Sequence, residues 1–156
     1  MLAATLVAQA QHVTEFVPAS GKGSIVVVVS GISGPPKYHA FSSAMADAGY
    51  YTLLVDGAQT WRGADKAIRG LVARAQASPH ALPGKAAVVG LSLGGAVVLR
   101  YAAQAPDVVY AGVAFYPATD RIADEDVALI RVPTLMLAAV HDTFSSVMRS
   151  SFGGSL

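Results

Sequence analysis

The segment that most constrains the fold is Gly90-Leu91-Ser92-Leu93-Gly94, which matches the pattern G-x-S-x-G. It follows an apolar strand-like run, residues 85–89, and precedes residues 96–105, a stretch apolar almost all round and typical of a buried helix. In this context the pattern predicts a sharp strand-to-helix turn with Ser92 at its tip. Glycines must flank such a turn because the two backbones approach closely. Ser92 would then lie at a helix N-terminus, where free N–H groups and the helix dipole favour a developing negative charge.

This segment allows two other interpretations. A glycine-rich strand-to-helix turn without chemistry would have the same residues. A dinucleotide or phosphate loop fits less well, because the chain has neither G-x-G-x-x-G nor a Gly-Lys-Ser/Thr ending at this position.

Elsewhere the chain alternates apolar strand-like runs with helical patterns, which predicts parallel βαβ units. The unbroken β-branched run Ser24–Ser30 is typical of a central strand that is buried on both faces. Residues 19–23 resemble a hairpin turn after the first strand, and residues 127–130 a single helical turn. Strands are expected over residues 12–17, 24–30, 50–55, 85–89, 108–115 and 133–140, and helices over residues 41–48, 64–75 and 96–105.

The composition agrees with such a fold and excludes several classes of protein. Hydrophobic residues make up 53% of the 156 residues and charged residues only 13%. The apolar runs are nevertheless too short for a membrane span, which needs about 18 apolar residues. The net charge of +1 without a basic block gives no indication of nucleic-acid binding. The absence of cysteine excludes disulfides and thiolate metal sites, and we expect neither a metal nor a cofactor.

The chain is expected to form one domain over residues 11–143. Residues 1–10 are apolar and end in Ala8-Gln9-Ala10, so they read either as the remnant of a signal peptide or as a frayed segment. The location, cytoplasmic or exported, therefore stays open. Residues 144–156 are rich in serine and glycine, and we assign them no structure.

Three segments together carry a family resemblance: VVGLSLGGAVVLRYAA, AGVAFYPATD and VPTLMLAAVHDTF. From about residue 12 to residue 144 the chain resembles the dienelactone hydrolase family of α/β-hydrolases. The resemblance implies a mostly parallel sheet with helices on both faces. It also implies hydrolysis of a small carboxylic ester or lactone through an acyl-enzyme intermediate. Dienelactone hydrolases proper carry cysteine at the turn, so this chain resembles their serine-bearing relatives.

The resemblance also implies roles for single residues. Ser92 would be the nucleophile, and Asp142, just after the last expected strand, would be the acid, with Asp120 as the substitute. The backbone N–H groups of Leu93 and Ile32 would form the oxyanion hole. Where the superfamily usually has His-Gly, this chain has Ser30-Gly31 before Ile32, but an N–H donor needs no particular side chain.

The catalytic histidine is the difficulty. In α/β-hydrolases it follows the acid, yet no histidine follows Asp142, and the chain ends at Leu156, too soon for a further crossover, a strand and a histidine loop. We therefore expect the last strand, the histidine loop and the last helix of the fold to be missing and the activity to be impaired. The alternatives are a non-catalytic binding domain and a truncated, inactive product. The four histidines are His12 and His80, expected at the surface, and His39 and His141, which could lie on the active face.

Two further expectations concern surfaces. Tyr38, Trp61 and Tyr116 follow strand ends, where open α/β sheets bind ligands, and so are candidates for a substrate pocket, although ordinary loop packing would also explain them. The last strand, residues 133–140, would be an exposed apolar edge and therefore a site of self-association.

Overall fold

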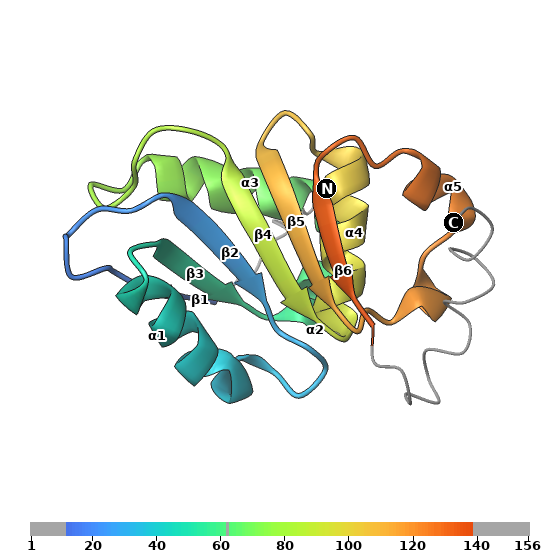
Figure 1. Ribbon diagram of the computed structural model, residues 1–156, viewed down its shortest axis with the longest axis horizontal. Coiled ribbons are helices and arrows are strands. Elements are labelled where there is room, and N and C mark those ends of the chain that lie inside the picture. Colours follow the sequence, from blue (N-terminus) through green and yellow to red (C-terminus); the bar gives the residue numbers. More distant parts are fainter. Residues whose placement is uncertain (1–11, 62, 139–156) are drawn as a thin grey trace, which may run out of the picture.

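The computed structural model describes residues 12–61 and 63–138, which form a six-stranded sheet with helices packed against it (Figure 1). The strands are β1 (Val13–Phe16), β2 (Ile25–Val29), β3 (Tyr51–Val55), β4 (Ala86–Leu91), β5 (Val109–Phe115) and β6 (Thr134–Leu137). The helices are α1 (His39–Asp47), α2 (Gly57–Trp61), α3 (Ala64–Gln76), α4 (Leu93–Gln104) and α5 (Asp124–Ala128), with short 3₁₀ turns η1 (Pro35–Tyr38) and η2 (Thr119–Arg121).

The strands lie in the order β1-β3-β2-β4-β5-β6, and every neighbouring pair except β1 with β3 is parallel. The expected hairpin between the first two strands is wrong, because β1 pairs with β3 instead of β2. Every residue of β2 is buried, and both of its edges are occupied by parallel partners. A strand with a partly exposed face, such as β1, is accommodated at the margin of the sheet.

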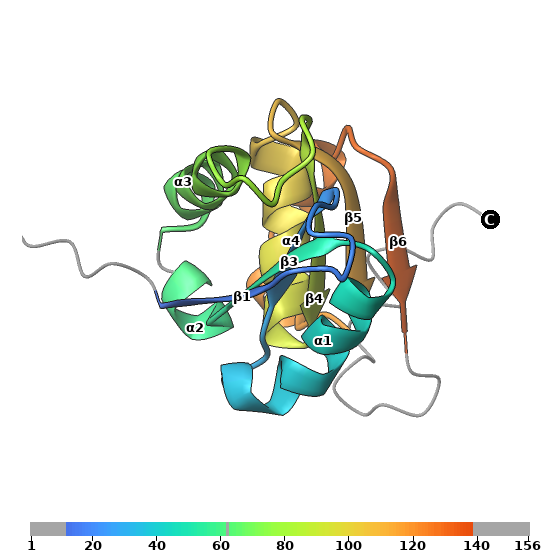
Figure 2. The same ribbon diagram turned by 90° about the vertical axis from the view of Figure 1, so that its left-hand side faces the viewer.

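Helices cover both faces of the sheet, as expected. Helix α1 lies on one face, and α2, α3 and α4 lie on the other (Figure 2). Alternate residues of β2 divide accordingly, because successive side chains of a strand point to opposite faces. Val27 packs in a cluster with Ile68 and Val98 from α3 and α4. Val28 packs with Phe41 and Met45 from α1.

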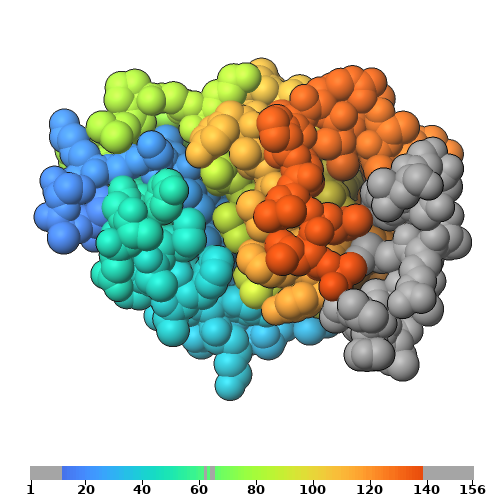
Figure 3. Space-filling model, viewed as in Figure 1, coloured from blue at the N-terminus to red at the C-terminus, as the bar shows by residue number. Residues whose placement is uncertain are grey.

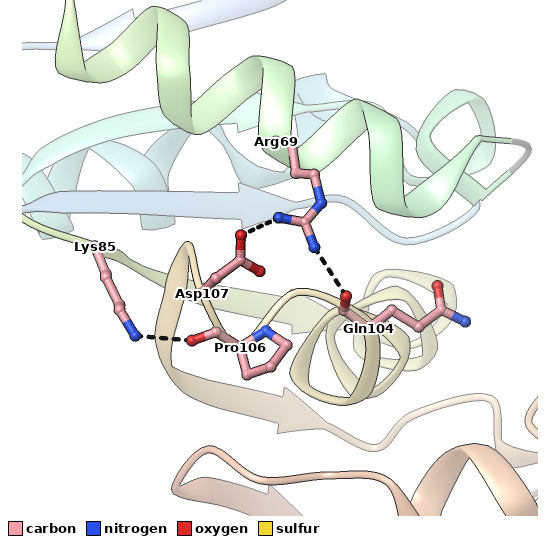
Figure 4. A network of polar contacts seen from close by, with 5 residues as sticks. All are labelled: Arg69, Lys85, Gln104, Pro106 and Asp107. Carbon is pink, nitrogen blue, oxygen red and sulfur yellow. Dashed lines mark hydrogen bonds and ion pairs between the residues drawn. The ribbon is translucent and has the colours of Figure 1, made fainter.

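The far end of α4 is fixed by a polar network (Figure 4). The Arg69 guanidinium on α3 pairs with the Asp107 carboxylate and donates to the Gln104 carbonyl oxygen at 3.1 Å. The Lys85 ammonium donates to the Pro106 carbonyl oxygen at 2.8 Å. The hydrogen bond from Arg69 lowers the pKa of Asp107. These contacts tie the α4–β5 connection to α3 and to the start of β4.

The expected strands and the three expected helices all occur, and the fold class is confirmed. The 3₁₀ turns and the short helix α2 were not anticipated, and α5 begins at Asp124, before the turn expected at residues 127–130. Of the last expected strand, residues 134–137 are in β6, and residues 139 and 140 lie outside the described residues. None of the helices in the described ranges has the length and apolar character that crossing a membrane requires.

Candidate active site

Ser92 is the single residue between β4 and α4, and its backbone has a conformation that residues other than glycine rarely adopt. Its φ is 55° and its ψ is −116°, and it is one of two non-glycine residues with positive φ in the described chain. Such a conformation costs on the order of 1–3 kcal/mol and persists only where its surroundings impose it. Here the Ser92 N–H donates to the Phe115 carbonyl oxygen at 3.0 Å, and the Ala118 N–H donates to the Ser92 carbonyl oxygen at 3.1 Å. The end of β5 therefore holds the turn in place.

The glycines on either side of Ser92 are required by close backbone contacts. A Cβ at Gly90 would collide with the backbone of Gly94, and a Cβ at Gly94 would collide with the carbonyl oxygen of Val29. The first turn of α4 thus lies directly against β4 and β2. This is the physical reason for the spacing G-x-S-x-G in this chain.

Ser92 opens into a cavity of about 440 Å³, which we call the Ser92 cavity. The volume is within the range of small-molecule sites, about 300–1,000 Å³. Its wall is built by the loop after β2, by α2, by the start of α4 and by the segment around η2. The lining residues are Ile32, Ala58, Trp61, Ser92, Leu93, Ala118, Asp120 and Arg121.

Both residues expected to supply the oxyanion hole line this cavity. Leu93 is the first residue of α4, and N–H groups in the first turn of a helix have no acceptor within the helix. Ile32 has an exposed side chain, and its loop runs beside Ser92. A Cβ at the preceding Gly31 would lie 3.5 Å from the Ser92 Cβ and would collide with the Tyr38 hydroxyl. The geometry brings the loop backbone and the α4 N-terminus to the same cavity.

The acid and base candidates lie partly within and partly outside the described residues. Asp142 and His141 lie outside the described residues. Asp120, the substitute acid, is exposed and lines the Ser92 cavity. None of the histidines in the described ranges lines it.

Each of those three histidines has a different environment. His12 is exposed. The His39 ring packs edge-on against Phe16, with the ring centroids 5.7 Å apart. The His80 Nδ1 lies 2.9 Å from the Gly21 carbonyl oxygen. The structure therefore assigns no base to Ser92 among them.

Of the three aromatic pocket candidates, Trp61 lines the cavity, whereas Tyr38 and Tyr116 are not among its lining residues. Tyr38 packs with Phe41 in the apolar cluster under α1. Tyr116 is 43% exposed and has a φ of 35°.

Sequence reasoning missed the helix that places Trp61. The Asp56 Oδ1 atom accepts hydrogen bonds from the N–H groups of Ala58 at 2.8 Å and Gln59 at 3.0 Å. Asp56 is thus the N-cap of α2, and aspartate directly after a strand was the available sequence signal for a helix start. Ala58, Ala118 and Arg121 were also missed as lining residues.

Solved structures with the same fold are numerous. A dienelactone hydrolase from Anabaena variabilis has a TM-score of 0.69 at 21% identity, over 90% of this chain and 73% of its own. Est1E from Butyrivibrio proteoclasticus with ferulic acid bound has a TM-score of 0.57 at 20% identity, over 69% of this chain and 49% of its own. The enol-lactonase from Burkholderia xenovorans has a TM-score of 0.53 at 16% identity, over 69% of this chain and 44% of its own.

The chain spans about half the length of Est1E. At these identities the structural likeness establishes the fold alone. None of the curated protein sequences compared with this chain matches it. The sequence profile of the dienelactone hydrolase family, in contrast, matches residues 55–150, which is more than half of the chain and includes the turn at Ser92. The chain belongs to the dienelactone hydrolase family.

Proposed function

We propose that this protein hydrolyses a small carboxylic ester or lactone, with Ser92 as the nucleophile. The observation that carries the proposal is the position of Ser92 at the tip of a strained turn, inside a cavity and at the N-terminus of α4. Membership of the dienelactone hydrolase family supports the same reaction class.

In the proposed reaction the Ser92 Oγ attacks the carbonyl carbon while a general base takes the hydroxyl proton. The carbonyl oxygen becomes an oxyanion that accepts hydrogen bonds from the N–H groups of Leu93 and Ile32. When the tetrahedral intermediate collapses, the C–O bond breaks and the leaving alkoxide takes the proton. A water molecule then attacks the acyl-Ser92 ester, which releases the acid and restores the hydroxyl. For a lactone the leaving alcohol remains part of the same product.

We assign the acid role to Asp142, with Asp120 as its substitute. A serine hydroxyl is a weak nucleophile without a base. Of the two candidates that the sequence offers, His141 and His39, His39 does not line the Ser92 cavity. The second candidate function, a non-catalytic domain that binds small molecules in the Ser92 cavity, is favoured by one observation: within residues 12–61 and 63–138 no histidine lines the cavity.

The decisive experiment is labelling with a fluorophosphonate, which reacts only with an activated serine, together with hydrolysis of p-nitrophenyl acetate. The proposal expects a label on Ser92 and turnover that Ser92→Ala abolishes. Equal turnover by both proteins, or no label on Ser92, would overturn the serine mechanism and leave the binding function.

We also propose self-association through β6. This strand is the last in the sheet order, and Leu135 and Leu137 are 58% and 39% exposed. In the space-filling view β6 lies at the surface of the molecule (Figure 3). An apolar strand at the edge of a sheet is a template for pairing with another chain.

A further inference from the structure

Among the described residues, the aromatic side chain in the wall of the Ser92 cavity is Trp61, at the end of α2. This short helix is held by the Asp56 cap at its start and by a hydrogen bond of 3.1 Å from the Gly57 N–H to the Ser30 Oγ. A Cβ at Gly57 would collide with the Ser30 carbonyl oxygen, so α2 lies directly against the end of β2. The backbone that carries Trp61 is therefore fixed relative to the cavity.

The Trp61 side chain has a second support in Arg100. The Arg100 Cζ lies 4.6 Å from the centroid of the Trp61 ring, within the range of a cation–π contact. The Arg100 Nε is buried and has no hydrogen-bond partner among the described residues. A buried donor without an acceptor is unfavourable, and the contact with the Trp61 ring is the favourable interaction that the described residues give this guanidinium. That contact in turn restricts the indole.

Arg100 and Ser92 belong to the same rigid element. Ser92 is the N-cap of α4, and Arg100 follows on that helix after roughly two turns. The helix is buried over most of its length, so it does not tilt without disturbing the core. One helix thus sets both the position of the Ser92 hydroxyl and the support beneath the aromatic wall.

We propose that Arg100 is a positioning residue that holds Trp61 as a flat wall of the cavity, and that this wall selects substrates with a planar, conjugated acyl or alcohol group. The remaining lining side chains explain the selection. Of the other described lining residues, Ile32, Ala58, Leu93 and Ala118 are aliphatic and offer no planar apolar surface, whereas Ser92, Asp120 and Arg121 are polar. A planar group stacks on an aromatic ring better than a puckered aliphatic one of the same size. The selectivity for substrates rests on the proposed hydrolase function, whereas the binding preference does not.

Trp61 is the only tryptophan of the chain, so its fluorescence reports this wall directly. Two neutral amides of similar size, benzamide and cyclohexanecarboxamide, serve as probes that differ in planarity. We expect a saturable change in Trp61 emission with benzamide at a concentration about fivefold lower than with cyclohexanecarboxamide. Arg100→Met should remove most of this difference, and Arg100→Lys, which keeps a cation over the ring, should restore most of it. Lys66→Met, which removes an exposed charge on α3, is the control.

Equal binding of the two amides, or an Arg100→Met protein that binds benzamide as well as the parent, would overturn the proposal. Circular dichroism shows whether each variant is folded. If Arg100→Met is unfolded, Arg100→Gln, which also removes the cation from the ring, takes its place. In hydrolysis, Arg100→Met should raise KM for the benzoate ester of an aliphatic alcohol about fivefold, while kcat and the KM for the acetate ester of the same alcohol stay within about twofold. If the amides are discriminated but no ester is hydrolysed, the wall stands and the hydrolase function fails. If esters are hydrolysed without discrimination, only the wall fails.

Discussion

Gly94, in the first turn of α4, lies so close to Val29 at the end of β2 that a Cβ on Gly94 would collide with the Val29 carbonyl oxygen. The helix that begins at Ser92 can approach the centre of the sheet only because this position has no side chain. The conformation of the Ser92 turn and the packing of α4 on the sheet therefore both depend on the lack of a Cβ at Gly94.

Gly94→Ala should destabilise the protein by about 3 kcal/mol, because α4 must move away from β2 or β2 must distort. Gly70→Ala is the matched control, since Gly70 lies in α3 with nothing within 4 Å of a Cβ. That substitution should stabilise the helix by about 0.5–1 kcal/mol. Chemical denaturation of both variants measures the two effects. Similar stabilities for the two variants would contradict the close contact at Gly94.

Substitution of His141 and of His39 tests which of these two histidines, if either, is the general base for Ser92. If His141 is the base, His141→Ala should reduce fluorophosphonate labelling of Ser92 by about a hundredfold or more, because general-base activation contributes on that order. His39→Ala should leave the labelling unchanged, since the His39 ring packs against Phe16 and not in the Ser92 cavity. The reverse result would assign the role to His39. Unchanged labelling in both single variants would exclude both residues as the base.

Acid stability should depend on a contact between β1 and β3. The Tyr51 hydroxyl donates a hydrogen bond of 2.6 Å to the Glu15 carboxylate, and the Arg74 guanidinium lies 2.8 Å from its other oxygen. The hydrogen bond from Tyr51, assisted by Arg74, holds the pKa of Glu15 below its ordinary value of 4.5. As the pH falls, Glu15 is therefore protonated at a higher pH in the unfolded chain than in the folded one. The stabilisation is present above pH 4.5 and is lost as the pH falls through the lowered pKa of the folded state.

Tyr51→Phe should therefore lower the free energy of unfolding by about 1 kcal/mol at neutral pH. Its difference from the parent should shrink as Glu15 becomes protonated below pH 4.5. Thermal unfolding followed across this pH range tests both points. Tyr110→Phe, at a tyrosine that is 46% exposed on β5, is the control and should change little at any pH. A Tyr51→Phe effect that stays constant with pH would show that the hydroxyl does not act through Glu15.

Self-association through β6 should be weakened by a charge on the edge strand. Leu135→Lys places an ammonium on a side chain that is 58% exposed, and charged residues on an edge oppose strand pairing. In sedimentation velocity, the combined fraction of dimers and higher oligomers should be smaller for Leu135→Lys than for the parent protein. Leu129→Lys, at a leucine 52% exposed near α5, is the control for the loss of an exposed apolar side chain. An equal effect of both substitutions would argue for non-specific association.

The strands and main helices were predictable from the sequence because their signals are local. The β-branched run of β2 reports burial on both faces, and the apolar spacing of residues 64–75 reports one buried helical face. The pattern at residues 90–94 located the turn at Ser92 because its signal is local as well. Its two glycines are required by close backbone contacts within the turn and next to it. Family membership also followed from segments that are continuous in the chain.

The type of each main element, the fold class and the position of the Ser92 turn thus follow from the amino-acid sequence alone. Three features depend on the three-dimensional arrangement: β1 pairs with β3, Trp61 and not Tyr38 or Tyr116 lines the Ser92 cavity, and Arg100 lies against Trp61. Hydrophobic periodicity reports which face of an element is buried but carries no information about its partner. Contacts such as Arg100 with Trp61 join residues far apart in the chain, and they exist only once α2 and α4 are packed on the same face of the sheet.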